Sequence, residues 1–199
     1  ETHFDVTALI AGWNRQTVIS VDYAKAPEHP FPAALDQVDA VIRWVATNAE
    51  MLGVDATRLS IGGDSAGGNL AAAATLDLRG EVPIAAQLLI YPACDFDQTR
   101  PSMIENANGP IVRVRDMDFV NRIYSPDLSQ LTSNPRVAPL VADSHAGLPP
   151  AYIAVAEFDP LRDSGLAYAA ALKAAGIPVV LDPGSGLIHG YLRAIDYCA

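Results

Sequence analysis

Basic residues are scarce in this sequence of 199 residues. It contains 13 lysines and arginines against 23 aspartates and glutamates, which gives a formal net charge of −10 at pH 7. Nucleic acids and anionic membrane surfaces attract proteins through positive charge, so an acidic chain of this kind is repelled by both. The composition therefore argues against nucleic acid and anionic lipid as partners.

Cysteines and long apolar runs are scarce as well. Cys94 and Cys198 are the two cysteines, and they provide neither a disulfide framework nor the spacing of a metal site. No run approaches the roughly 18 apolar residues of a membrane span, and no signal-peptide pattern is present. The default expectation is a protein of the reducing cytoplasm with no membrane span.

Hydrophobic residues make up 50% of the sequence, enough for one well-buried domain. Apolar runs alternate along the chain with segments of helical periodicity. Strands are predicted at 17–23, 58–61, 84–91, 151–156 and 179–181, and helices at 7–14, 32–48, 70–78 and 164–175. This alternation is typical of a single α/β domain over residues 1–199, with a mostly parallel sheet covered by helices on both faces.

The alternation breaks between Cys94 and Leu148. That stretch is rich in Asp, Asn, Ser and Pro, with one helical candidate at 117–124. Loops this long inside a compact domain are usually lids or binding segments. We therefore expect a cap insertion at 95–146, after the strand at 84–91, although the residues leave a passive excursion open.

A serine between glycines stands where the predicted strand at 58–61 meets the helix at 70–78. Residues 63–67 read Gly-Asp-Ser-Ala-Gly, the G-x-S-x-G spacing of a nucleophile elbow. Such a turn strains the serine backbone and brings neighbouring backbone so close that a Cβ at Gly63 or Gly67 would clash. The alternative is a phosphate-binding or packing turn, but the run lacks the Lys-Ser/Thr of a P-loop and the G-x-G-x-x-G spacing.

A serine nucleophile needs a base and a group that orients the base. Asp159 and His189 each follow a predicted parallel strand, as Ser65 does, so all three lie at the same edge of the sheet. Three other histidines are weaker candidates, because they are terminal, in a proline-rich loop or in the insertion: His3, His29 and His145. Glu157 and Asp163 compete with Asp159, and placement favours Asp159. Asp64 is expected to form structural hydrogen bonds.

Several motifs together resemble the hormone-sensitive-lipase-like branch of the α/β-hydrolases. They are Gly63-Asp64-Ser65-Ala66-Gly67-Gly68, Asp22-Tyr23 followed by Ala26-Pro27-Glu28-His29-Pro30-Phe31-Pro32-Ala33-Ala34, Asp159-Pro160-Leu161-Arg162-Asp163, and His189-Gly190. The resemblance implies hydrolysis of short- to medium-chain carboxylic esters, with no metal or organic cofactor. It implies Ser65 as nucleophile, His189 as base and acid, Asp159 as orienting carboxylate, and the Ala66 N–H as an oxyanion donor. The substrate would be a small-molecule ester, with the insertion forming part of the cap over the acyl pocket.

One family motif is missing. The His-Gly-Gly-Gly segment that supplies further oxyanion donors is not in this sequence, nor are the first strands of the fold. We therefore expect the chain to be a fragment of a longer protein, with doubtful activity alone. Without the neighbouring strand, 17–23 must pair directly with the strand at 58–61 or leave a gap, and exposed apolar sheet edges favour aggregation or a homodimer.

Two other functions remain open. The same triad could cleave another acyl bond, such as an amide or a lactone, because triad residues do not select the acyl substrate. The chain could also be a non-catalytic binding protein on a hydrolase scaffold. All three candidate triad residues are present, which makes a purely binding role the weaker hypothesis.

Overall fold

A four-stranded parallel sheet forms the centre of the molecule. A computed structural model describes residues 3–194, and Cys198 lies outside that range. The strands are β1 (Ser60–Asp64), β2 (Ala86–Ile90), β3 (Ala151–Ala154) and β4 (Val179–Asp182). They pair in the order β1-β2-β3-β4, so chain order and spatial order agree. The predicted parallel α/β architecture is confirmed.

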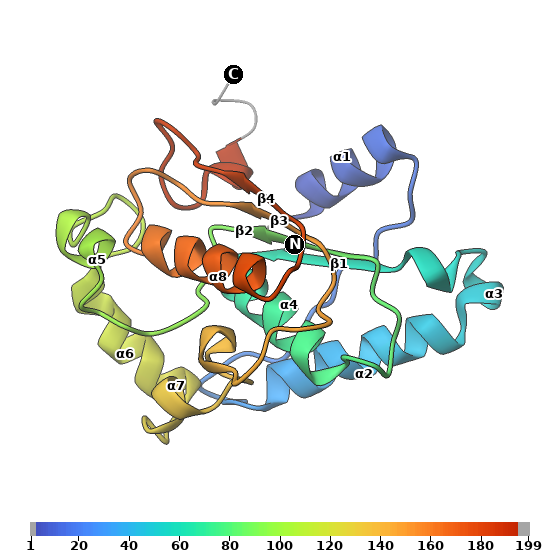
Figure 1. Ribbon diagram of the computed structural model, residues 1–199, viewed down its shortest axis with the longest axis horizontal. Helices are drawn as coiled ribbons and strands as arrows, with labels where there is room; N and C mark the ends of the chain where they lie inside the picture. Colours follow the sequence, from blue (N-terminus) through green and yellow to red (C-terminus); the bar gives the residue numbers. More distant parts are fainter. Residues whose placement is uncertain (1–2, 195–199) are drawn as a thin grey trace.

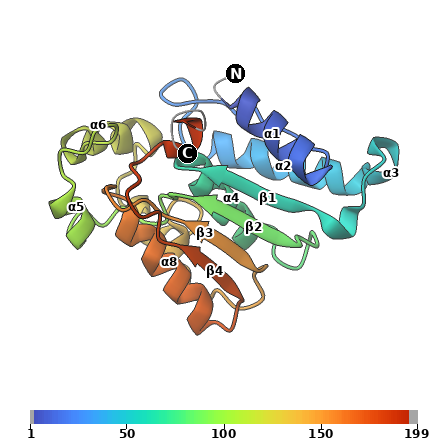
Figure 2. The same ribbon diagram turned by 90° about the horizontal axis from the view of Figure 1, so that it is seen from above.

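Helices lie on both sides of the sheet. Figure 1 shows α2, α4 and α8 below it and α1 above it, and Figure 2 shows α1 beside β1. The main helices are α1 (Phe4–Asn14), α2 (Ala33–Thr47), α4 (Ala66–Asp77) and α8 (Arg162–Ala174); shorter ones are α3 (Ala49–Leu52), η1 (Ala56–Arg58) and η3 (Tyr191–Ala194). The four predicted helices are confirmed, although α4 and α8 begin before the first residue of the ranges 70–78 and 164–175 that apolar periodicity predicted.

The core lies between the sheet and its lower helix layer, and α4 forms the centre of that layer. Eight consecutive residues of α4, from Gly68 to Thr75, are buried. Half of them are alanines, whose small side chains let the helix approach β1 and β2 on one side and α2 on the other. Burying apolar surface on both sides of α4 therefore stabilises its packing against the sheet and against α2.

The opposite face of the sheet is only partly covered. Leu88, Tyr152 and Val180 are register partners across β2, β3 and β4, and they are 37%, 40% and 61% exposed. Near the carboxyl ends of the strands, Tyr191 and Leu192 pack on this face. An apolar row therefore remains open at mid-strand.

The predicted strand at 17–23 is wrong. These residues are irregular and Ile19 is 43% exposed. No strand in the described part of the chain pairs with them, and direct pairing with β1 does not occur. A β-prone sequence does not form a strand unless a neighbour accepts its backbone hydrogen bonds.

The segment 95–146 forms α5 (Pro101–Glu105), α6 (Val114–Tyr124), α7 (Gln130–Ser133) and η2 (Pro139–Val141). It is more helical than its composition suggested, since only the helix at 117–124 was predicted. Figure 2 shows α5 and α6 at one end of the sheet, away from the α3 end. Its role as a cap remains a proposal.

Candidate active site

Ser65 occupies a strained turn between β1 and α4. Its φ of 55° and ψ of −117° lie in a region that L-residues rarely adopt. A Cβ on Gly63 would overlap the backbone of Gly67, and one on Gly68 would approach Pro92 Cβ to 2.9 Å. A Cβ on Gly67 would meet nothing within 4 Å, so the steric expectation is wrong there. The tight positions are Gly63 and Gly68.

The three candidate residues form one hydrogen-bonded chain. His189 Nε2 lies 2.9 Å from Ser65 Oγ, and His189 Nδ1 lies 2.7 Å from Asp159 Oδ2. Asp159 is fully buried and His189 is nearly so. An ionised carboxylate only accepts hydrogen bonds, which places the imidazole proton on Nδ1 and leaves Nε2 to accept from the serine hydroxyl.

Backbone pairing aligns the two loops that carry Asp159 and His189. A parallel bridge joins Phe158 to Ile188, the residues just before them. The Phe158 N–H also donates to the Leu187 carbonyl at 3.0 Å. Parallel pairing beyond the ends of β3 and β4 thus places the acid beside the imidazole.

The competing acids have other partners. Glu157 Oε2 accepts from the Gly186 N–H at 2.7 Å. Asp163 accepts from the Ser102 N–H and from Arg162, which holds the pKa of its carboxyl below its usual value despite partial burial. Asp64 accepts from the Tyr91 hydroxyl at 3.1 Å, as expected of a structural residue.

Of the other histidines, two lie away from Ser65 and one lies near it. His29 is exposed, and buried His145 contacts the Pro139 carbonyl at 3.1 Å. The terminal histidine His3 has its Nε2 atom 3.1 Å from Asp64 Oδ1. It therefore approaches the residue before Ser65.

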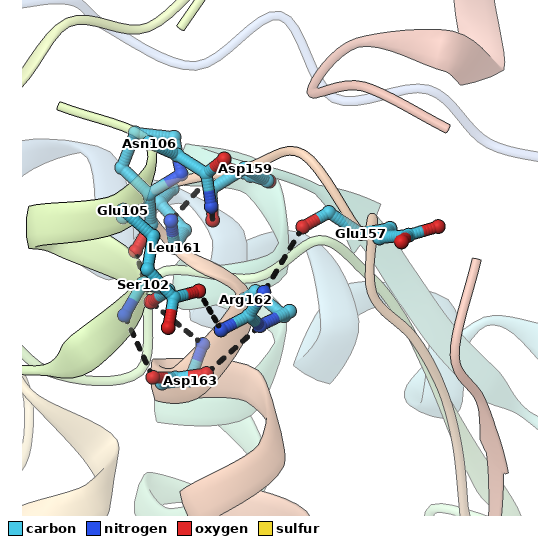
Figure 3. Close-up of polar contacts among 9 residues, drawn as sticks. Ser102, Glu105, Asn106, Glu157, Asp159, Leu161, Arg162 and Asp163 are labelled. Carbon is cyan, nitrogen blue, oxygen red and sulfur yellow. Dashed lines mark hydrogen bonds and ion pairs between the residues drawn. The ribbon is translucent and has the colours of Figure 1, made fainter. Parts of the chain in front are cut away.

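Helix α5 holds the loop that carries Asp159 (Figure 3). Ser102 Oγ donates to the Pro160 carbonyl at 2.7 Å and accepts from the Asp163 N–H at 3.1 Å. The Leu161 N–H donates to Asp159 Oδ1 at 2.9 Å, so both carboxylate oxygens of Asp159 are satisfied. The insertion thereby supports the acid turn.

Sequence reasoning missed Tyr91. Its ring lies against that of His189, with centroids 4.6 Å apart. It directly follows β2 at the edge of the sheet where Ser65, Asp159 and His189 lie. Those three residues were selected because each follows a parallel strand, and Tyr91 does so too. It was missed because only nucleophiles, acids and bases were considered.

Other candidate features are simpler. Ala66 is the first residue of α4, so its N–H belongs to the first turn, where helix amides have no intrahelical partner.

A cavity of about 560 Å³ lies between Phe96 and the residues of α6 and α7, and Ser65 does not line it. Among the described residues, no three His, Cys, Asp or Glu side chains converge to bind a metal, and no helix is suited in length and hydropathy to crossing a membrane.

Comparison with known proteins identifies a family. The profile of a family described as alpha/beta hydrolase fold matches residues 1–193. Esterase LipI of Mycobacterium tuberculosis is 45% identical over 177 residues, covering 88% of this chain and 55% of LipI. Carboxylesterase NlhH of the same species is 44% identical over 198 residues, covering 97% and 62%.

Solved structures are similar over nearly the whole chain. DphMB1 has a TM-score of 0.93 at 43% identity, covering 98% of this chain and 65% of that one. EstE1, a thermostable carboxylesterase from a metagenomic library, has a TM-score of 0.93 at 36% identity, covering 98% and 67%. The chain spans 55% to 62% of the length of LipI and NlhH.

Proposed function

The chain belongs to the α/β-hydrolase fold family, in its hormone-sensitive-lipase-like branch, and on that premise we propose that the protein is a serine carboxylesterase. The observation that carries this proposal is the hydrogen-bonded chain from Ser65 through His189 to buried Asp159. The names of its relatives support it, since LipI is an esterase and NlhH a carboxylesterase.

Acylation would begin at Ser65. As Oγ attacks the ester carbonyl carbon, its proton moves to Nε2 of His189, and the resulting imidazolium is stabilised by the carboxylate of Asp159. The tetrahedral oxyanion would accept a hydrogen bond from the Ala66 N–H, helped by the positive end of α4. The imidazolium then gives its proton to the departing alcohol, which leaves an acyl-serine.

Deacylation would repeat these steps with water. His189 takes a proton from a water molecule as its oxygen attacks the acyl carbonyl, and the proton returns to Ser65 Oγ when the carboxylic acid leaves. Further oxyanion donors would come from a His-Gly-Gly-Gly segment, which these 199 residues do not contain. Losing one such donor costs roughly 10²- to 10³-fold in kcat.

We propose short- to medium-chain acyl esters as substrates, with 95–146 forming part of the cap. Among the described residues, the side chains that contact His189 are those of Ser65, Asp159 and Tyr91, and both carboxylate oxygens of Asp159 already accept hydrogen bonds within the protein. An uncharged acyl group fits such surroundings better than a charged one.

The first experiment measures hydrolysis of p-nitrophenyl esters from acetate to decanoate. It compares this chain and a longer form carrying the His-Gly-Gly-Gly segment, each with its Ser65→Ala variant and with Ser133→Ala as control. Ser133 is an exposed serine of α7, so its hydroxyl should not matter. We expect activity that Ser65→Ala abolishes and Ser133→Ala leaves unchanged.

Labelling by a fluorophosphonate, detected as added mass on Ser65, tests the nucleophile without requiring turnover. A folded longer form that neither hydrolyses any ester nor accepts the label would overturn the proposal and favour a binding role. Labelling without ester turnover would overturn the ester assignment and point to another acyl bond, such as an amide or lactone.

A further inference from the structure

Tyr91 has a backbone conformation that a tyrosine rarely adopts. Its φ is +35°, in the range that favours glycine, and its side chain is 1% exposed. The Tyr91 N–H donates to the Ala154 carbonyl at 2.6 Å, which continues the β2–β3 pairing by one residue. Strain of this kind persists only where the surrounding structure enforces it, and it occurs most often at functional sites.

The strained turn brings the Tyr91 ring against the loop that carries the base. Its centroid lies 4.6 Å from that of His189, with the planes at 51°, and 5.1 Å from that of Tyr191, at 77°. His189 and Tyr191 flank Gly190, whose φ is +82°. The loop therefore turns around a single tyrosine, with one aromatic contact on each side of the glycine.

The hydroxyl group at the other end of the same ring contacts the residue before the nucleophile. It donates to Asp64 Oδ2 at 3.1 Å, and Asp64 directly precedes Ser65. Burial, with the negative charge of Asp64, raises the pKa of the Tyr91 phenol well above its usual value, so the group remains a donor. One side chain thus links the residue before the nucleophile to the imidazole.

We propose that Tyr91 is a positioning residue: its ring, clamped by Tyr191, holds the imidazole of His189 in line with Ser65 Oγ. Hydrogen bonds hold the imidazole at two points, Nδ1 to Asp159 and Nε2 to Ser65, and a ring held at two points can still tilt about the line that joins them. Aromatic packing on its face restricts that tilt. This inference rests on the proposed function, since the aligned Nε2 is the atom that takes the serine proton.

The chain offers a matched control. Tyr168 is also a fully buried tyrosine in edge contact with a histidine, His145, with centroids 5.4 Å apart. It lies in α8, in the core below the sheet. Tyr91→Leu and Tyr168→Leu therefore remove the same group from similar surroundings, but only the first removes a ring from His189. Tyr91→Phe keeps the ring and removes the hydroxyl.

Two measurements are made on each variant. One is the low-field proton NMR signal of His189 Nδ1–H, identified by its loss in His189→Gln; the other is kcat and KM for a p-nitrophenyl ester. We expect Tyr91→Leu to broaden or remove the proton signal and to lower kcat by roughly 10- to 100-fold with little change in KM, because small misplacements of a catalytic group are costly. Tyr91→Phe should keep the signal and stay within about threefold of the parent, and Tyr168→Leu should do the same.

The proposal is overturned if Tyr91→Leu keeps the signal and matches Tyr168→Leu in kcat, or if Tyr91→Phe is as damaged as Tyr91→Leu. The NMR signal does not depend on turnover, so it still tests the positioning role if no ester is hydrolysed. Should Tyr91→Leu fail to fold, Tyr191→Leu decides, because Tyr191 is only partly buried. A lowered kcat with unchanged KM and a broadened signal in that variant supports the clamp, and no change in either overturns it.

Discussion

Removal of one hydroxyl group from α5 should destabilise the loop that carries Asp159. Ser102 is fully buried. Its Oγ donates to the Pro160 carbonyl and accepts from the Asp163 N–H, so it serves two backbone groups on either side of Leu161. In Ser102→Ala both backbone groups lose this partner.

The magnitude follows from these two contacts. A buried polar group left without a partner costs roughly 1–3 kcal/mol, so two such groups give roughly 2–6 kcal/mol. Domains of this size unfold with about 5–15 kcal/mol, so the variant should lose a large share of its stability. The Leu161 N–H bond to Asp159 lies in the same turn, and we therefore expect kcat to fall as well.

Urea unfolding followed by circular dichroism measures the change. The control is Ser133→Ala, which removes an exposed hydroxyl that donates to the Ser129 carbonyl and should cost less than about 0.5 kcal/mol. If the two variants lost the same free energy of unfolding, Ser102 would not support the acid turn and the reasoning would be refuted.

Three further predictions follow. Asp159→Asn should lower kcat by about 10⁴-fold, because the amide nitrogen can face His189 Nδ1 and move the imidazole proton to the wrong nitrogen; ester hydrolysis measures this, and a loss below tenfold would contradict it. Leu88→Thr with Val180→Thr should reduce self-association in analytical ultracentrifugation while changing stability little, since both side chains are exposed; unchanged association would contradict it. Burial, with the nearby charge of Asp77, raises the pKa of Asp39 to about 7, so its contribution to stability is full below pH 3.8 and is lost as pH rises through about 7. Asp39→Asn should therefore gain stability relative to the parent between pH 4 and pH 8 in urea unfolding, and an equal difference at both pH values would contradict this.

The sequence alone was sufficient to select the three side chains that form one hydrogen-bonded chain in the structure. Glycine spacing around Ser65 marks a turn that few other structures require, and parallel strands bring the residues that follow them to one edge. Both arguments are local or topological, so they need no coordinates. The structure places His189 within hydrogen-bonding distance of both Ser65 and Asp159, and the catalytic roles of the three residues remain proposals.

The tertiary structure decided which segments pair as strands and which distant side chains support the candidate site. Residues 17–23 have the composition of a strand yet form none, because a strand exists only where a neighbour accepts its hydrogen bonds. Gly63 and Gly67 are the two glycines of the motif, but only at Gly63 would a Cβ overlap neighbouring backbone. Ser102 and Tyr91 carry no motif at all. Their contacts join segments about 60 and 100 residues apart, and a sequence pattern does not record which distant segments a fold brings into contact.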